Sequence, residues 1–508
     1  MKADMKHFVV VGGGIAGLSA AYHLQKKALE TDLPHQLTVL EAGSYWGGKI
    51  ITDRIDGFVV EGGPDTFIVT KPWGVQLCKE LGLSERLKGT NPHQKNTYIL
   101  HNERLHSLPG GLTMMIPTEF GPMIRTGLLS WPAKVRMGMD FLLPPAMENG
   151  DETLGEFVTR RLGRQAYERL IEPLMSGIYA GDGDKLSLQA TFPYLRDLEV
   201  EHGGLVKGAL ALRKQRARRQ RQENGNHGNK PPQGSRSIFL TPITGLAEIV
   251  EALVSHLEAG GADMRLNTQV TEAQPHKDGF SLYLNEGEPI ACGGLVLATP
   301  AFISGDLVTG FAPELARELR AIEYVSTATV SLAYQESDLN QPLDGYGYVI
   351  PRREGRKALA CTWTSTKFPH RAPQGYALVR VFIGRAGQEG DLPWDEDGLQ
   401  ALAQEEVRQT LGITVEPHMA RVYRWDKAMP QFNIGHPARL ERIDGLIKDI
   451  PGLGLAGNGY QGIGIPDCIH SGQQAADQVL EAVSTPVKSA LPNHPESISM
   501  LTKAGERL

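Results

Sequence analysis

Apolar residues at the start of the chain follow the order of a strand, a turn and a helix. Residues 7–11 form a short β-branched run, glycines occupy residues 12–14, and apolar residues recur at helical spacing in residues 15–30. A second apolar run at residues 35–42 is typical of another strand. Because the intervening helix is too long for a hairpin, the pattern predicts a parallel β-α-β unit.

The middle of the chain changes pattern twice. Residues 111–195 carry apolar patches interrupted by Pro and Gly, which indicates a separate, mainly helical lobe. Residues 320–440 alternate β-rich runs with one acidic helix, so a sheet-based lobe is expected there. The run at residues 294–301 is typical of a buried strand that ends in a turn and could rejoin the first unit.

Two polar stretches lack any apolar period. Residues 213–236 are basic and contain Gly and Pro, so we predict a mobile surface loop over residues 213–237. The loop is either a solvated insertion or a patch that attracts an acidic substrate or an anionic lipid. Residues 485–508 are expected to form a flexible tail.

The length of 508 residues implies two or three lobes, because single hydrophobic cores stop growing near roughly 250–300 residues. Hydrophobic residues make up 41% and charged residues 22% of the chain, which is typical of a folded globular protein. The formal net charge of −6 argues against a nucleic-acid partner, because such binding needs clustered cationic charge.

The four cysteines, Cys78, Cys292, Cys361 and Cys468, are far apart and form no C-x-x-C pair. This spacing predicts neither a zinc site nor a disulfide framework, and no metal is expected. The amino terminus lacks a signal-peptide pattern, and no apolar stretch reaches the roughly 18 residues of a membrane span. We therefore expect a cytoplasmic protein with at most peripheral membrane contact.

A glycine motif near the start indicates a bound dinucleotide. Gly12, Gly14 and Gly17 form G-x-G-x-x-G between the first strand and its helix, which permits a tight turn and close approach of a pyrophosphate. Glu41 ends the next strand, where a carboxylate accepts hydrogen bonds from ribose hydroxyls and repels a 2′-phosphate. A tight structural turn is the alternative for the glycines alone.

Three further glycine-rich segments favour a flavin over a nicotinamide cofactor. Gly47 and Gly48 precede Lys49 in a second loop that suits the larger FAD. Residues 61–67 offer a backbone surface for a flat ring, with an ordinary turn as the alternative. Backbone N–H groups at residues 463–465 begin a helix and suit the electron-rich edge of a reduced flavin or, alternatively, a second phosphate.

These motifs occur in an order that resembles one enzyme family. The segments are VVVGGGIAGLSAA (9–21), LEAGSYWGGKI (40–50), EGGPDTF (61–67), LIEPLMSGIYAGDGDKLS (170–187), CTWTSTKFPHRAP (361–373), RWDKAMPQFNIGH (424–436) and GIGIPDCIHSG (462–472). Over residues 6–482 the chain resembles the FAD-dependent porphyrinogen oxidases and, more narrowly, the coproporphyrinogen III oxidases of Gram-positive bacteria.

The resemblance implies an α/β, multi-lobe fold. It combines a Rossmann-like FAD-binding fold of the amine-oxidase and porphyrinogen-oxidase type with a β-rich substrate domain and a helical, membrane-facing lobe. The expected FAD-binding domain is discontinuous and contains residues 1–85, 238–305 and 440–484. The expected substrate-binding domain contains residues 86–110 and 306–439, and the expected helical lobe spans residues 111–212.

The resemblance also implies where FAD binds. The expected contacts are Gly12, Gly14, Ala16 and Gly17 at the pyrophosphate, Glu41 and Ala42 at the ribose, Gly48 and Lys49 in the second loop, Gly63 and Pro64 beside the flavin, Val270 at the adenine, and Trp425, Gly457, Ile463 and Ile465 around the flavin. No catalytic side chain is expected, because flavin N5 accepts the hydride.

The implied reaction is the oxidation of coproporphyrinogen III to coproporphyrin III in heme biosynthesis. It removes six electrons in three two-electron turnovers, with oxygen as the expected acceptor and hydrogen peroxide as product. The flat macrocycle needs apolar walls, and its propionates need cations. Ile178 and Tyr179 are the candidate walls and Lys71 is the candidate cation; lobe packing and a solvated lysine are the respective alternatives.

Other functions fit parts of the same pattern. The residues alone also fit protoporphyrinogen IX, so a protoporphyrinogen IX oxidase is the alternative within the family. A flavin amine oxidase and a non-catalytic dinucleotide-fold binding protein are more remote alternatives. The expected partners are the porphyrinogen substrate, oxygen and a downstream enzyme of heme synthesis that receives the product.

Overall fold

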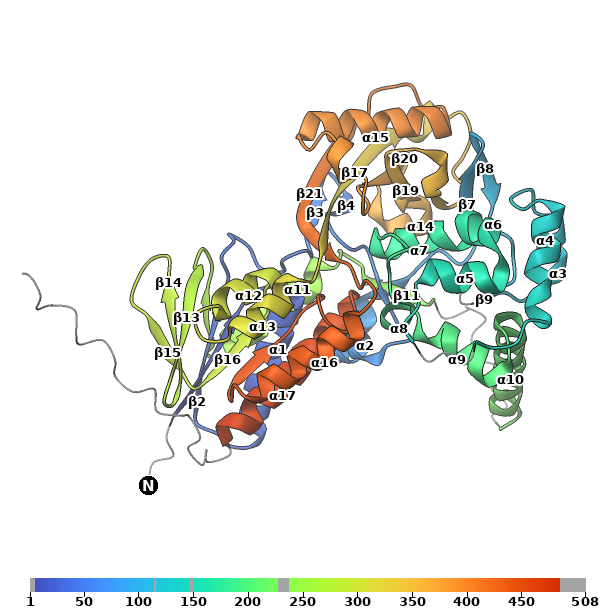
Figure 1. Cartoon of the computed structure of the whole chain (residues 1–508). Helices are drawn as coiled ribbons and strands as arrows, with labels where there is room; N and C mark the ends of the chain where they lie inside the picture. The colour runs from blue at the N-terminus through green and yellow to red at the C-terminus, as the bar shows by residue number, and fades with distance from the viewer. Residues whose placement is uncertain (1–4, 114–115, 147–149, 227–236, 485–508) are drawn as a thin grey trace, which may run out of the picture.

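The computed structural model describes residues 5–113, 116–146, 150–226 and 237–484. They form a parallel sheet with its helices, a second and larger sheet, and a helical lobe (Figure 1). This arrangement confirms the predicted α/β, multi-lobe fold class. The predicted domain boundaries stay a prediction.

A five-stranded parallel sheet has the strand order β12-β2-β1-β16-β22. The strands are β1 (Lys6–Val11), β2 (His35–Leu40), β12 (Asp263–Arg265), β16 (Gly294–Leu297) and β22 (Leu453–Leu455). The parallel pairing of β1 with β2 confirms the β-α-β unit, and β16 confirms the strand expected at residues 294–301. Segments from both ends of the chain therefore share one sheet.

Helices cover both faces of the parallel sheet. One face carries α1 (Ile15–Glu30), α11 (Ala247–Ala259) and α17 (Ile465–Ser484). The other face carries α12 (Ala301–Val308), α13 (Pro313–Arg320), α16 (His436–Lys448) and a meander of β13 (Val270–His276), β14 (Gly279–Leu284) and β15 (Ile290–Cys292). Phe8 and Val10 of β1 face the first set, whereas Val9 and Val11 face the second. A strand buried on both faces explains the unbroken apolar run.

The larger sheet has seven strands in the order β21-β17-β20-β19-β18-β7-β8. They are β7 (Asn96–His101), β8 (Arg104–Ser107), β17 (Tyr324–Gln335), β18 (Gly345–Val349), β19 (Ala358–Trp363), β20 (Tyr376–Ile383) and β21 (Met419–Pro430). Only the β18–β7 pair among them is parallel. The expected acidic helix is α15 (Glu396–Leu411), which packs on this sheet through Leu399, Ala403 and Val407.

Short elements connect the two sheets. They are β3 (Thr52–Ile55), β4 (Phe58–Glu61), β5 (Phe67–Ile68), α2 (Pro72–Glu80), β6 (Leu87–Gly89), β11 (Phe239–Pro242) and α14 (Thr364–Lys367). Strand β11 pairs with both β5 and β6, and β3 pairs with β4. Phe58 and Val60 of β4 pack against the larger sheet, whereas Phe67 of β5 and Leu77 of α2 pack in the core of the parallel sheet, so the chain reaches the larger sheet and returns.

The helical lobe forms its own core. Its elements are β9 (Leu112–Thr113), β10 (Ile116–Pro117), α3 (Phe120–Arg125), α4 (Trp131–Gly138), α5 (Leu154–Leu162), α6 (Arg164–Ala166), the π-helical turn η3 (Tyr167–Ile171), α7 (Glu172–Tyr179), α8 (Leu188–Thr191), α9 (Pro193–His202) and α10 (Leu205–Asn226). Buried side chains such as Phe157, Leu170 and Leu198 join these helices in one cluster.

Helix α10 corrects one prediction. We expected a loop from residue 213, but residues 213–226 continue α10. The first turns of the helix are buried in the lobe core, and the Arg, Gln and Ala residues that follow have high helix propensity although they lack an apolar period. The rest of the predicted loop at residues 227–236 and the predicted tail at residues 485–508 lie outside the described residues.

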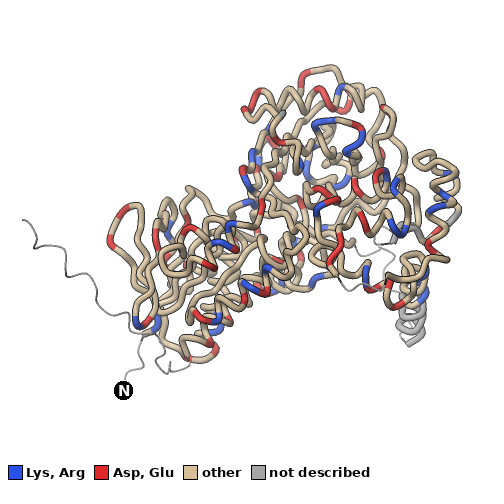
Figure 2. The backbone as a smooth tube through the Cα atoms, in the orientation of Figure 1, with Lys and Arg blue, Asp and Glu red and all other residues tan. Residues whose placement is uncertain are grey.

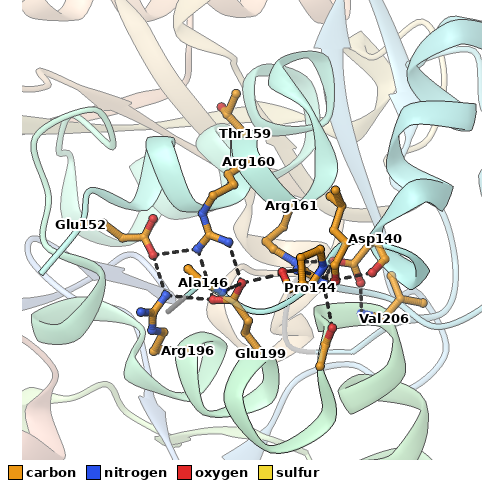
Figure 3. A network of polar contacts seen from close by, with 12 residues as sticks. Asp140, Pro144, Ala146, Glu152, Thr159, Arg160, Arg161, Arg196, Glu199 and Val206 are labelled. Atoms are coloured by element: carbon orange, nitrogen blue, oxygen red, sulfur yellow. Dashed lines mark hydrogen bonds and ion pairs between the residues drawn. The ribbon is translucent and has the colours of Figure 1, made fainter. Parts of the chain in front are cut away.

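A buried arginine joins α5 to the segments around it in the lobe (Figure 3). The Arg161 Nε donates to the Asp140 carboxylate at 2.7 Å, and its Nη1 lies 3.4 Å from the Glu199 carboxylate. Asp140 also accepts the backbone N–H of Val206, in the first turn of α10, at 2.8 Å. All three charged side chains are fully buried, so each depends on the others for compensation.

The same network extends to partly exposed charges (Figure 3). Arg160 donates to Glu199 at 2.6 Å and to Glu152 at 2.8 Å. Arg196 lies 2.9 Å from both of these carboxylates. Burial alone would raise the pKa of Glu199, but hydrogen bonds from Arg160 lower it, so this carboxylate stays ionised at neutral pH.

Replacing the central guanidinium tests this network. Arg161→Ala leaves Asp140 buried without its cation and removes one of the three arginines around Glu199, so the free energy of unfolding is expected to fall by about 3–5 kcal/mol. Denaturant unfolding followed by circular dichroism measures the change. Arg164→Ala is the control, because this side chain is 54% exposed in its pairs with Glu168 and Asp184, and it should cost less than about 1 kcal/mol. Equal losses for both variants would contradict the argument.

Candidate active site

The first glycine turn joins β1 to α1 in a conformation that requires glycine. Gly12 has φ +109°, and a Cβ on it would lie 2.7 Å from the Ala298 carbonyl oxygen. A Cβ on Gly17 would overlap the Gly12 carbonyl oxygen. Gly14 is the N-cap of α1 and provides no side-chain cap, which leaves the positive end of the helix suited to an anion.

The second glycine loop packs directly on the first. The Gly47 N–H donates to the Gly13 carbonyl at 2.8 Å. A Cβ on Gly48 would lie 3.2 Å from the Cα of Gly14, and Gly48 has φ +60°. The two predicted loops therefore form one surface of backbone atoms.

The Glu41 carboxylate faces the first glycine turn from the end of β2. It accepts backbone N–H groups from Gly13 at 2.6 Å and from Gly43 at 2.7 Å. These two hydrogen bonds fix the carboxylate beside the turn. From the sequence, the ribose of the cofactor is expected at this carboxylate. Ala42, the next residue, is exposed.

Val270 follows a segment that is bonded to the backbone of Glu41. It is buried at the start of β13, and the N–H of Thr268, two residues before it, donates to the Glu41 carbonyl at 2.9 Å. The structure thus brings the residues expected at the ribose and the adenine to one edge of the parallel sheet.

The segment between β4 and β5 is held by side chains of the larger sheet. We call residues 62–64 the GGP loop. The Gly62 carbonyl accepts Thr329 Oγ1 at 2.7 Å, Trp425 Nε1 at 3.0 Å and Arg380 Nη2 at 3.0 Å. These donors come from β17, β21 and β20. The indole N–H of Trp425 is therefore bonded to the loop that it was expected to accompany.

The other side of the GGP loop contacts the second glycine loop. A Cβ on Gly63 would overlap the Lys49 carbonyl oxygen, so only glycine fits. Arg380 also donates to the Gly63 carbonyl. Pro64 follows and is half-buried. The loop is thus clamped between the two sheets.

Three cations and two carboxylates surround the base of the GGP loop. Lys367 lies 3.0 Å from the Asp65 carboxylate, and Arg371 lies 3.0 Å from the Glu61 carboxylate. Burial alone would raise the pKa of Asp65, but the charges of Lys367 and the two arginines outweigh it and hold the pKa well below its usual range. Burial raises the pKa of Glu61 against the opposing charge of Arg371. Arg371 and Arg380 each keep buried N–H groups without a protein partner.

The C-terminal turn lies against the first glycine turn. A Cβ on Gly472 of α17 would overlap the Ala16 carbonyl oxygen of α1. Gly457 has φ +138°, and its N–H donates to Ser471 Oγ at 3.1 Å, which ties the turn to α17. This packing brings the C-terminal part of the described chain against the first glycine turn.

The two isoleucines of this turn face different cores. Ile465 begins α17 and is buried in the core of the parallel sheet. Ile463 packs against the core of the helical lobe. Residues 463–465 therefore lie at the junction of these two parts.

Lys71 forms an ion pair and stays partly exposed. Its Nζ lies 2.6 Å from the Asp467 carboxylate in the first turn of α17. Burial, followed by the charge of Asp467, raises the pKa of the Tyr179 phenol. Tyr179 is also packed edge-on against Phe432, as the lobe-packing alternative expects. Ile178 is 48% exposed on α7.

The residues present fit FAD. Among the described residues, none forms an ion pair with Lys49, which is half-buried between the glycine loops and whose pKa is lowered by burial. A pyrophosphate needs positive charge and close approach to the backbone. The Lys49 ammonium and the uncapped N-terminus of α1 supply the charge, and the glycines of the two loops allow the approach. No group of three or more metal-ligating side chains is present in the described ranges.

Three contributors were missed by reasoning from the sequence. Asp467 lies within a quoted motif but was given no role, and Thr329 offers no signal apart from its position in a β-rich run. Arg380 does offer a signal, because an arginine stands in the otherwise apolar strand YALVRVFI. A buried charge in such a strand indicates a specific partner.

Comparisons with known proteins agree with this geometry. The model of the flavin containing amine oxidoreductase family matches residues 15–480. A coproporphyrinogen III oxidase of Bacillus subtilis is 37% identical over 94% of this chain and 99% of its own, and one of Propionibacterium freudenreichii is 36% identical over 95% and 92%. The chloroplastic protoporphyrinogen oxidase 1 of Spinacia oleracea is 29% identical over 94% and 84%. A solved structure from Exiguobacterium superposes with a TM-score of 0.80 at 32% identity, covering 94% of this chain and 99% of that chain.

The Gly63 position tests whether the GGP loop contributes to FAD binding. Gly63→Ala forces the loop away from Lys49, so the purified protein is expected to lose most of its flavin absorbance at about 450 nm relative to that at 280 nm. Gly445→Ala in α16 is the control, because a Cβ there meets open space. Unchanged flavin content in Gly63→Ala would remove the loop from the FAD site.

Proposed function

The chain belongs to the flavin containing amine oxidoreductase family, and we propose that it oxidises coproporphyrinogen III to coproporphyrin III in heme biosynthesis, with FAD as cofactor and oxygen as acceptor. The observation that carries this proposal is the nearly full-length likeness to bacterial coproporphyrinogen III oxidases. Protoporphyrinogen oxidases are more distant relatives. Hydrogen peroxide is the expected second product.

FAD supplies a two-electron acceptor, so the six-electron oxidation needs three turnovers. The chain provides the cradle: the glycine turns and the Lys49 ammonium hold the pyrophosphate, and Glu41 holds the ribose. The GGP loop and the turn before α17 orient the ring. Because Arg380, Thr329 and Trp425 fix the loop, the binding surface is preorganised before substrate arrives.

The substrate is proposed to lie where the helical lobe meets α17. Ile178 offers apolar surface to the macrocycle, the adjacent Tyr179 adds the small part of its side chain that is exposed, and Lys71 offers a cation to a propionate. Coproporphyrinogen III carries four propionates, so a charged rim favours it over protoporphyrinogen IX, which carries two. No side chain is assigned a proton-transfer role, because positioning and water exclusion are the tasks of the protein.

A cytoplasmic location is proposed from the cysteines. All four described cysteines are free thiols and buried. Burial raises the pKa of Cys78 and of Cys292 to about 12, which keeps these thiols protonated. Free thiols suit a reducing compartment, where a downstream enzyme of heme synthesis could receive the product.

Peripheral membrane contact is proposed for the helical lobe. None of the described helices combines the length and apolar composition needed to cross a bilayer. However, the α3–α4 edge exposes Ile124, Val135, Trp131 (66% exposed) and Leu142 (82%). Lys134 lies 4.7 Å from the Trp131 ring centre, and Figure 2 shows further basic residues in this lobe. Apolar side chains mixed with cations suit an anionic membrane surface.

The substrate proposal is tested by supplying each porphyrinogen under air. The purified protein is expected to show bound flavin and to produce coproporphyrin III fluorescence with a higher kcat/KM than that for protoporphyrinogen IX. Reactions without protein control for autoxidation. Faster oxidation of protoporphyrinogen IX would favour the alternative substrate, and flavin-loaded protein that oxidises neither would contradict the proposed enzyme.

The membrane proposal is tested by sedimentation with anionic phospholipid vesicles. The double variant Trp131→Ser/Leu142→Ser removes two exposed apolar groups, so vesicle affinity is expected to fall at least about tenfold. Leu29→Ser is the control, because this residue is 62% exposed on α1, outside the lobe. Equal vesicle binding by the double variant and the wild-type protein would show that this edge does not contact the membrane.

A further inference from the structure

The ion pair between Lys71 and Asp467 has one exposed and one enclosed partner. The Lys71 side chain is 44% exposed, whereas that of Asp467 is 14% exposed. Lys71 is the N-cap residue of α2, and Asp467 lies in the first turn of α17. The ammonium can therefore reach an incoming molecule while the carboxylate stays with the protein.

The backbone of the C-terminal turn wraps around the Asp467 carboxylate. A Cβ on Gly462 would lie 2.5 Å from Asp467 Cγ, and one on Gly464 would lie 3.0 Å from its Oδ2. Neither glycine has a positive φ, so the backbone conformation does not require glycine at these positions. The space taken by the Asp467 carboxylate does, because a larger side chain would collide with it. Asp467 thus has a defined place that does not depend on Lys71.

Other contacts hold α2 against α17. The rings of Trp73 and His470 stack with centroids 4.0 Å apart and planes 10° apart. A Cβ on Gly74 would lie 2.9 Å from the Phe67 ring and 3.4 Å from Pro466. The two helices therefore stay packed if Lys71 changes its partner.

The turn before α17 borders the helical lobe that carries the proposed substrate wall. Ile463, four residues before Asp467, packs against the core cluster of this lobe, and Tyr179 belongs to that cluster. Asp467 therefore lies on the segment of the chain that adjoins the proposed substrate site.

We propose that Asp467 is an internal counter-ion that competes with a substrate propionate for Lys71. This inference rests on the proposed function. In the free protein Asp467 neutralises the ammonium; on binding, a propionate takes its place as the partner of Lys71. Because the porphyrin product carries the same propionates as the substrate, the competition also limits how tightly the product is held. Asp467 is thus a positioning residue that sets affinity through Lys71.

The affinity for coproporphyrin III tests the competition without turnover. Fluorescence titration of the FAD-loaded protein gives its Kd. Asp467→Asn frees Lys71 and is expected to lower Kd about three- to fivefold, as for the loss of one partly exposed competing charge. Lys71→Met is expected to raise Kd. In the Lys71→Met background, adding Asp467→Asn should leave Kd unchanged within about twofold.

Matched variants separate charge from structure. Asp477→Asn lies on the same helix, where its side chain bonds His23 at 2.7 Å, and should leave Kd unchanged. Flavin absorbance and melting temperature check that each variant is folded and loaded. If Asp467→Asn fails this check, Asp467→Ser removes the same charge with a smaller side chain and should shift Kd in the same direction.

Two results would overturn the inference. Asp467→Asn could raise Kd or leave it unchanged, or it could change Kd by the same factor with and without Lys71. If the wild-type protein oxidises coproporphyrinogen III, either result for the variants overturns only the counter-ion role of Asp467. A wild-type protein that oxidises no porphyrinogen instead overturns the proposed function, so the two failures are distinguishable.

Discussion

The close approach of α17 to α1 is the constraint on which the rest of the structure depends. The Gly472 backbone packs on the Ala16 carbonyl so tightly that no side chain fits between them. Because α17 is held there, its first turn lies beside the glycine turn and reaches Lys71. The cradle and the charged pair both depend on this one contact between helices.

The GGP loop connects the glycine loops of the parallel sheet to the larger sheet. The Gly62 carbonyl receives donors from three strands, and Gly63 lies against Lys49 on the opposite side. A carbonyl shared by three donors resists reorientation, so the two sheets keep one relative position at this point. The buried Arg161 network does comparable work inside the helical lobe, where it joins α5, α9 and α10.

Local sequence patterns predicted the parts of the fold that depend on local chemistry. Glycine spacing and apolar runs indicated β1, α1, β2 and the helix that begins at residues 463–465, because these elements follow from turn geometry and burial. The contact of Lys71 with Asp467 joins residues 396 positions apart, and nothing in either neighbourhood specifies the other. The continuation of α10 over residues 213–226 was missed because helix propensity, rather than apolar periodicity, sustains the helix beyond its packed start. The FAD and substrate roles of individual residues stay predictions.

The position of β22 at the sheet edge has a consequence for synthesis of the protein. Strand β1 is made first, but its sheet is completed only by residues 453–455, and α1 finds its helical neighbour only in residues 465–484. A nascent chain therefore carries its glycine turn through the synthesis of the intervening lobes without the elements that enclose it. Complete enclosure of the cofactor is accordingly expected late, after the intervening lobes have had time to fold as units.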